Sequence, residues 1–159
     1  MPIREKKHRL SPPLYHGPIA AAFTLCLKNR EPFFITRERF KTMQEILFQS
    51  LRRFTCDAYI YLFMPDHLHL LLKGKSDNSD LYACVKHFKQ YSGYWFYKSK
   101  AGVEWQKSFY DHILRQDEEI EKQVRYILGN PLRRGLTQNW KTYSYKGSTM
   151  YNFEDWDVL

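Results

Sequence analysis

The chain has 159 residues, of which 43% are apolar and 17% aromatic, a composition that suits one domain with its own core and excludes a disordered chain. Its net charge of +8 and its pI of about 9.4 favour a polyanionic partner, most commonly nucleic acid, although a basic protein without such a partner has the same charge. No apolar run reaches about twenty residues, so the sequence predicts no transmembrane helix.

Three cysteines, Cys26, Cys56 and Cys84, are widely spaced and form no C-x-x-C pair. Their odd number and spacing argue against a disulfide framework or a cysteine zinc site. We therefore expect buried thiols in a protein of the reducing cytoplasm. The first ten residues are basic but have no apolar core, which argues against a secretory signal.

Residues 1–18 are basic and interrupted by prolines, without regular periodicity, and predict an N-terminal arm. Apolar patterning then predicts a strand over residues 19–27 and a helix that runs from a Thr36 cap to Arg53. Two further strands, over 57–63 and 67–73, flank a tight turn and predict a hairpin.

The second half of the chain continues the alternation of helices and strands. We expect a helix over 77–98, a strand over 109–115 and a helix that begins with Asp117 as its cap and ends at Asn130-Pro131. The order β-α-β-β-α-β, followed by one more helix, predicts an α+β, ferredoxin-like domain over 19–137, with an antiparallel sheet and helices on one face. Residues 138–159 form an aromatic tail that should pack on this domain or on a second subunit.

Two histidines, His67 and His69, alternate with leucines on the predicted third strand. Because successive side chains of a strand point to opposite faces, Leu68, Leu70 and Leu72 form a core row and both histidines lie on the other, open face. Two imidazoles on one side of a strand can bind the same metal ion. A solvent-facing pair with ordinary hydrogen bonds would give the same pattern.

Tyr126 lies off the apolar stripe of the last predicted helix. Around the helix axis, the apolar residues of this stripe fall within an arc of about 100°. They are Ile120, Val124, Ile127 and Leu128. Tyr126 lies roughly 145° from the centre of that arc. A phenol becomes a useful nucleophile when an adjacent cation favours the phenolate and polarises the phosphorus under attack. Tyr126 is therefore a candidate nucleophile. Asn130, one turn later, is a candidate third ligand for Mg²⁺ or Mn²⁺, although Asn is also common at helix ends.

Basic and aromatic side chains supply candidate contacts with nucleic acid. Five cations could bind a phosphate backbone: Lys86, Lys89, Arg115, Arg133 and Arg134. Three tyrosines could stack on unpaired bases: Tyr91, Tyr94 and Tyr110. A structural or second-shell role is expected for His112, and residues 4–9 could form a DNA-contacting arm. Each of these residues, taken singly, is better explained as a solvated charge or a packed aromatic.

Three segments carry a resemblance to a known family: FMPDHLHLL over 63–71, FYDHILR over 109–115, and YILGNP over 126–131 with Gly135-Leu136 beyond it. In their order and spacing they resemble the single-tyrosine transposases of the HUH endonuclease superfamily, especially the REP-associated tyrosine transposases. The resemblance covers roughly residues 18–145, and the arm and the tail match the family poorly.

The resemblance implies a ferredoxin-like, usually dimeric protein that nicks single-stranded DNA at hairpin-associated sites. It implies that His67 and His69 bind a divalent metal and that Tyr126 becomes linked to the 5′-phosphate of the DNA, which frees a 3′-hydroxyl. Asn130 stands where a polar residue, glutamine in many relatives, often completes the metal site. A homodimer and single-stranded or hairpin DNA are the partners implied.

Two other functions fit part of the pattern. The first is a nucleic-acid-binding module of the same descent that does not cleave, and the presence of both histidines and the tyrosine disfavours it. The second is a metal-dependent hydrolase in which the histidines activate water and Tyr126 is incidental. The sequence has no H-E-x-x-H or H-x-x-E-H motif, which weakens the second alternative.

Overall fold

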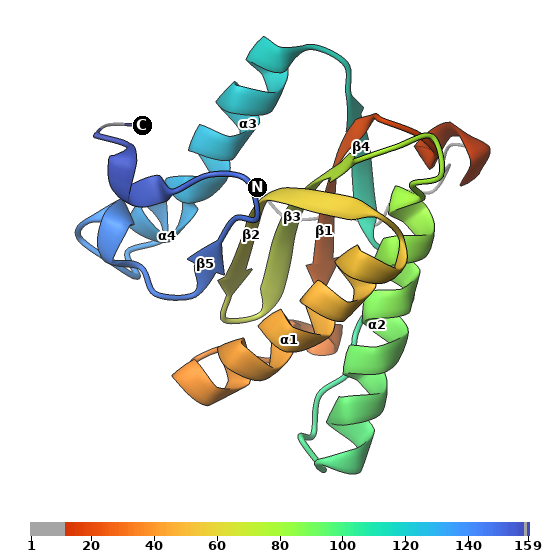
Figure 1. The fold of residues 1–159 in the computed structure, drawn as a ribbon. Helices are drawn as coiled ribbons and strands as arrows, with labels where there is room; N and C mark the ends of the chain where they lie inside the picture. Colours follow the sequence, from red (N-terminus) through yellow and green to blue (C-terminus); the bar gives the residue numbers. More distant parts are fainter. Residues whose placement is uncertain (1–11, 158) are drawn as a thin grey trace.

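The computed structural model of the chain describes residues 12–157 and 159. Its centre is an antiparallel sheet of five strands in the order β4-β1-β3-β2-β5 (Figure 1). The strands are β1 (Ala20–Cys26), β2 (Cys56–Met64), β3 (His67–Gly74), β4 (Tyr110–Leu114) and β5 (Lys146–Gly147). The α-helices are α1 (Arg37–Arg53), α2 (Leu81–Lys98), α3 (Asp117–Leu128) and α4 (Asn130–Arg133). The predicted α+β, ferredoxin-like order is confirmed.

The helix starts follow from local capping. Thr36 caps α1 as predicted, and its hydroxyl accepts a hydrogen bond from the Arg39 amide at 3.2 Å. The predicted start of α2 at residue 77 is wrong, because Asp80 is the cap and accepts from the Ala83 amide at 2.9 Å. The predicted cap of α3 is also one residue late, since Gln116 holds the cap position and Asp117 is the first helical residue.

Both faces of the sheet are covered, so the prediction of helices on one face only is wrong. The helices α1 and α2 pack on the face that carries Leu68, Leu70 and Phe23. The helix α3 and the C-terminal segment pack on the other face, against Leu71 and Leu62. The histidines therefore do not lie on an open face. The strands carry apolar residues on both sides, which is the usual mark of a doubly covered sheet.

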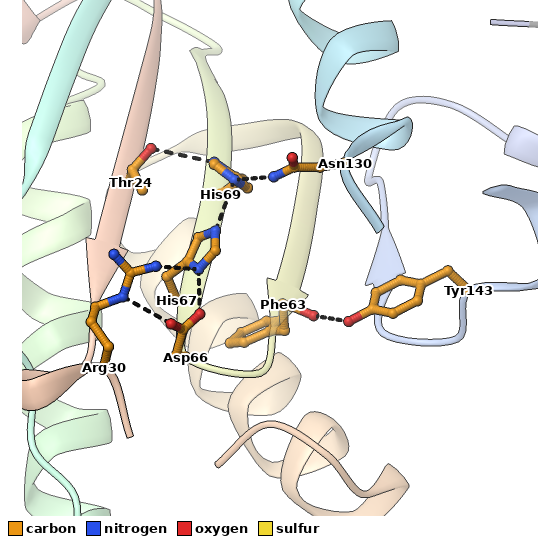
Figure 2. A network of polar contacts seen from close by, with 8 residues as sticks. All are labelled: Thr24, Arg30, Phe63, Asp66, His67, His69, Asn130 and Tyr143. Carbon is orange, nitrogen blue, oxygen red and sulfur yellow. Dashed lines mark hydrogen bonds and ion pairs between the residues drawn. The ribbon is translucent and has the colours of Figure 1, made fainter. Parts of the chain in front are cut away.

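The aromatic tail packs on its own domain. Trp140, Tyr143 and Phe153 are buried in the second core, and β5 pairs with β2. The Tyr143 hydroxyl donates to the Phe63 carbonyl at 2.6 Å (Figure 2). Gly147 is required at the β5 pairing, because a Cβ atom there would lie 2.2 Å from the Tyr61 hydroxyl.

The N-terminal segment enters the first core at Tyr15. This side chain is fully buried, packs against Phe23 and Tyr82, and donates its hydroxyl to the Asp111 carboxylate. The basic residues 4–9 lie outside the described residues. All three cysteines are buried, as predicted. None of the helices in the described part of the chain has the length and apolar character needed to cross a membrane.

The packing of α3 yields a first prediction. Leu128 is fully buried in the second core, whereas Tyr126 is 59% exposed. Leu128→Ala should lower the free energy of unfolding by about 2–5 kcal/mol through the cavity that it creates. Tyr126→Phe should change it by less than about 0.5 kcal/mol. Urea unfolding followed by circular dichroism measures both, and equal losses would contradict this docking of α3.

Candidate active site

The two histidines lie on β3, the central strand of the sheet. Their backbone neighbours are Cys26 and Thr24 on β1, and Met64 and Leu62 on β2. Both rings are on the face that α3 covers. They meet edge to face, with ring centroids 4.8 Å apart and Nε2 atoms 3.1 Å apart (Figure 2). The same-face placement predicted from the alternating leucines is confirmed.

His67 is held by the carboxylate of Asp66, the residue before it. The Asp66 Oδ1 atom lies 2.6 Å from His67 Nδ1, and Arg30 Nε donates to Asp66 Oδ2 at 2.9 Å. Burial opposes ionisation of Asp66, but the hydrogen bonds from His67 and Arg30 and the positive charge of Arg30 outweigh it and lower its pKa to about 2. Because the carboxylate is ionised, the shared proton belongs to Nδ1 of the ring. His67 Nε2 is then left with a lone pair.

Arg30 reaches this position because the loop after β1 wraps around the β2–β3 turn. The amide of Leu27 donates to the Asp66 carbonyl, and the amides of Phe33 and Phe34 donate to the Pro65 carbonyl. Asn29 and Arg30 have φ values of 59° and 53°, in the left-handed region that non-glycine residues rarely adopt. The surrounding hydrogen bonds thus hold a strained turn that brings Arg30 to the site.

His69 contacts polar groups from two other elements. Its Nδ1 atom lies 3.3 Å from the Thr24 hydroxyl of β1, and its Nε2 atom lies 2.7 Å from Nδ2 of Asn130 (Figure 2). An amide nitrogen can only donate, so Nε2 of His69 carries a lone pair and Nδ1 carries the proton. Burial, reinforced by the charges of neighbouring cations, lowers the His69 pKa to about 3. Burial likewise lowers the pKa of His67.

Both rings are therefore neutral at pH 7. Their Nε2 atoms lie 3.1 Å apart, and the Asn130 amide nitrogen lies 2.7 Å from Nε2 of His69. Two nitrogens bound to one ion at about 2.1 Å lie roughly 3.0–3.4 Å apart at ligand angles of about 90–110°. The pair thus fits a shared metal ion. The described residues contain no group of three His, Cys, Asp or Glu side chains placed to hold a metal, and the Asn130 amide, 2.7 Å from Nε2 of His69, is the candidate third ligand.

Tyr126 is near the end of α3, and its exposure agrees with the predicted orientation off the packing face. The guanidinium of Arg133 lies 4.0 Å from the centre of its ring, and Arg133 Nη2 donates to the Tyr126 carbonyl at 2.5 Å. The junction of α3 and α4 permits this contact, since a Cβ atom on Gly129 would lie 2.6 Å from Arg133 Nη1. The same junction places Asn130 beside His69.

Comparison with known proteins identifies the family of this chain. The family model of the IS200-like transposases matches residues 18–130, a segment that includes both histidines, Tyr126 and Asn130. The chain belongs to the IS200-like transposase family.

Relatives and solved structures of transposases are similar to this chain over most of its length. A protein of Haemophilus influenzae assigned as a REP-associated tyrosine transposase is 26% identical over 77% of this chain and 76% of its own. The REP-associated tyrosine transposase of Escherichia coli is 25% identical over 71% of this chain and 66% of its own length. A solved REP-associated tyrosine transposase bound to a REP hairpin has a TM-score of 0.74 at 18% identity, covering 89% of this chain and 81% of that one.

A second solved structure, of a protein from Deinococcus radiodurans assigned as a transposase, has a TM-score of 0.53 at 21% identity. The match covers 79% of this chain and 96% of the Deinococcus radiodurans protein. At these identities the two solved structures show a shared fold.

The cations predicted to bind DNA occupy different parts of this transposase. Arg133 touches Tyr126, and the charge of Arg134 contributes to the lowered pKa of both histidines. Arg115 lies at the start of α3, and its backbone amide donates to Glu119. Lys86 and Lys89 lie on α2, which packs on the other face of the sheet, and Lys89 Nζ donates to the carbonyls of Gln106 and Lys107. The fold thus brings Arg133 and Arg134, but not the two lysines, to the histidines.

The sequence analysis did not assign three residues of the site: Arg30, Asp66 and Thr24. The role of Asp66 could have been predicted from its position, because a carboxylate directly before a paired histidine can fix the tautomer of that histidine. Thr24 could be placed only once the register of β1 against β3 was known. Arg30 lies 36 residues before Asp66, and no pattern in this transposase's sequence connects them. His112 is exposed on β4. In the cross-strand pairing it lies level with Leu71 of β3, and not with His67 or His69.

The role of Asp66 can be tested in the metal-free protein. Long-range ¹H–¹⁵N spectra should show His67 and His69 as neutral Nδ1–H tautomers at pH 7. In Asp66→Ala, His67 should move toward the Nε2–H tautomer, because its Nδ1 proton loses its acceptor. Glu104→Ala, which removes a surface carboxylate paired with Lys28, is the matched control and should change neither ring. An unchanged His67 tautomer in Asp66→Ala would contradict the assignment.

Proposed function

We propose that this transposase cleaves single-stranded DNA beside a hairpin, by attack of Tyr126 on a backbone phosphate next to a divalent metal, Mg²⁺ or Mn²⁺. The observation that carries the proposal is the convergence of the Nε2 atoms of His67 and His69 at 3.1 Å. This separation matches that of two nitrogens bound to one cation.

His67, His69 and Asn130 would hold the metal. The Asn130 amide can present either its oxygen or its nitrogen from one position, and its oxygen is the atom that a hard cation requires. When bound, the cation supplies charge neutralisation at the phosphate oxygens and polarises the phosphorus. Asp66 keeps Nε2 of His67 free for coordination, and burial keeps both rings neutral.

Tyr126 would then act as the nucleophile. Its phenol oxygen forms a bond to phosphorus while the bond from phosphorus to the 3′ oxygen breaks. The phenol proton passes to solvent, and the departing 3′ oxygen takes up a proton. The products are a 5′-phosphotyrosine and a free 3′-hydroxyl, so that the bond energy is retained for rejoining. Arg133, which contacts the ring, carries a positive charge that favours a phosphate at this place.

The choice of DNA rests on the family and on the solved relative that is bound to a REP hairpin. The net charge of +8 and the cations Arg133 and Arg134 beside the histidines agree with a polyanionic substrate. A homodimer stays a prediction from the family.

A pool of oligonucleotides, each with a hairpin flanked by random single-stranded sequence, tests the cleavage without a known target. The protein is incubated with this pool and Mg²⁺ or Mn²⁺, denatured, and recovered with any DNA attached to it. Wild type should retain DNA, and Tyr126→Phe should retain at least a hundredfold less, because the attacking oxygen is gone. The attached peptide is identified by mass spectrometry.

Tyr110→Phe is the matched control. This second exposed tyrosine lies on β4 in the cross-strand row of His69 and Thr24. Removal of the Tyr110 hydroxyl should leave the amount of the DNA–protein adduct unchanged. Cleavage that persists in Tyr126→Phe would contradict the proposal and favour a water-activating hydrolase, whereas an adduct lost in Tyr110→Phe would move the nucleophile to that residue.

A further inference from the structure

The helix α2 exposes three tyrosines on one side. Tyr91, Tyr94 and Tyr97 are 49%, 60% and 79% exposed. At 100° per residue around the helix axis, these three tyrosines fall within an arc of about 120°. The centre of this arc lies about 140° around the axis from the centre of the buried stripe of α2. We call this surface the tyrosine face of α2. Large aromatic groups left in water on one side of a helix mark a candidate interaction surface.

His87 extends the tyrosine face toward the start of the helix. Its ring stacks on that of Tyr91, with centroids 4.3 Å apart and planes 28° apart. The Ser50 hydroxyl lies 2.8 Å from His87 Nδ1 and ties the ring to α1. The ring pair is therefore a prearranged aromatic platform. The three tyrosines continue it over about 9 Å of helix axis, enough for a short run of unpaired bases.

The charged side chains that α2 itself carries are all lysines. Residues 81–100 contain no aspartate or glutamate. Lys86, Lys98 and Lys100 are exposed, and Lys86 and Lys98 fall on opposite sides of Tyr94 around the helix. Aromatic faces bordered by cations are the combination that binds single-stranded nucleic acid, because bases stack on the rings while the cations accompany the phosphates.

This surface is separate from the candidate active site. The buried stripe of α2 packs on the face of the sheet that carries Leu68 and Leu70, whereas the histidines lie on the opposite face under α3. Figure 1 shows α2 and α3 on different sides of the sheet. A strand bound along α2 would therefore not be the segment that undergoes cleavage.

We propose that the tyrosine face of α2 is an accessory binding surface for single-stranded DNA, on which unpaired bases stack against Tyr91, Tyr94 and Tyr97. The choice of DNA rests on the proposed function, and the surface itself rests on the exposed rings and their charge. Such a surface would hold a second segment of the substrate while the active site engages the scissile phosphate on the other side of the sheet.

A second copy of the chain fits the same surface poorly. A twofold interface places one patch against itself, so that Lys86 and Lys98 of one subunit would face the same lysines of the other. With no acidic residue in 81–100 to pair with them, these charges would repel on burial. The polyphosphate backbone of DNA instead offers the opposite charge.

The test compares Tyr94→Leu/Tyr97→Leu with Tyr94→Phe/Tyr97→Phe. Both positions are exposed, so each variant should fold, which a thermal melt checks. Fluorescence anisotropy in EDTA measures binding of a labelled thymidine 20-mer without cleavage. We expect the leucine variant to bind about tenfold or more weakly, since stacking is lost, and the phenylalanine variant to match wild type within about twofold. A 20-mer that carries 5-iodouracil should photo-crosslink to the peptide of residues 81–98.

Equal affinity of the leucine variant, with crosslinks only outside residues 81–98, would overturn the inference. Formation of the Tyr126 adduct by the same preparations would then show that the proposed function survives. Crosslinks on α2 together with weaker binding would support the inference even if no adduct forms. Sedimentation of wild type as a dimer and of the leucine variant as a monomer would make this face a contact between copies, and would also overturn it.

Discussion

The hydrogen bond between Asp66 and His67 fixes the arrangement on which the candidate site depends. At 2.6 Å, with the carboxylate ionised, it places the proton on Nδ1 and leaves Nε2 as an acceptor. Arg30 compensates the carboxylate charge through its own ion pair at 2.9 Å. Nε2 of His67 is thereby left without a proton, 3.1 Å from Nε2 of His69. A pair of histidines on one strand face becomes a metal-binding pair only through this tautomer.

The fold supplies the other conditions that this pair requires. On the central strand of a doubly covered sheet His67 is buried and His69 is half-buried, which lowers the pKa of both rings and keeps them neutral and able to coordinate. The covering element α3 continues into α4, and the junction brings Asn130 to His69 while Tyr126 stays on the exposed side. The C-terminal segment stabilises the same layer through the buried Tyr143 and its bond to the Phe63 carbonyl. The contacts that pack α3 and the C-terminal segment on this face of the sheet therefore also position the residues of the candidate site.

The parts that could be predicted from sequence are those set by local periodicity. Alternation along β3 placed His67 and His69 on one face, and the helical stripe of α3 placed Tyr126 off its packing face. The start of α2 was misplaced because several residues between 76 and 80 can cap a helix; Asp80 is the cap, and it also contacts His16 and the Phe54 carbonyl. The predicted open face was wrong because strand periodicity identifies one core row and does not reveal a second layer. Arg30 was missed because only the folded loop joins it to Asp66.

The most direct test of the account is anomalous diffraction from crystals of the protein equilibrated with Mn²⁺. The account predicts one strong manganese peak between Nε2 of His67 and Nε2 of His69, with the Asn130 oxygen turned toward it. The peak should be absent from His69→Ala crystals treated in the same way. Manganese bound elsewhere, or bound to His67 through Nδ1, would contradict the central claim that Asp66 holds the two imidazoles ready for one metal ion.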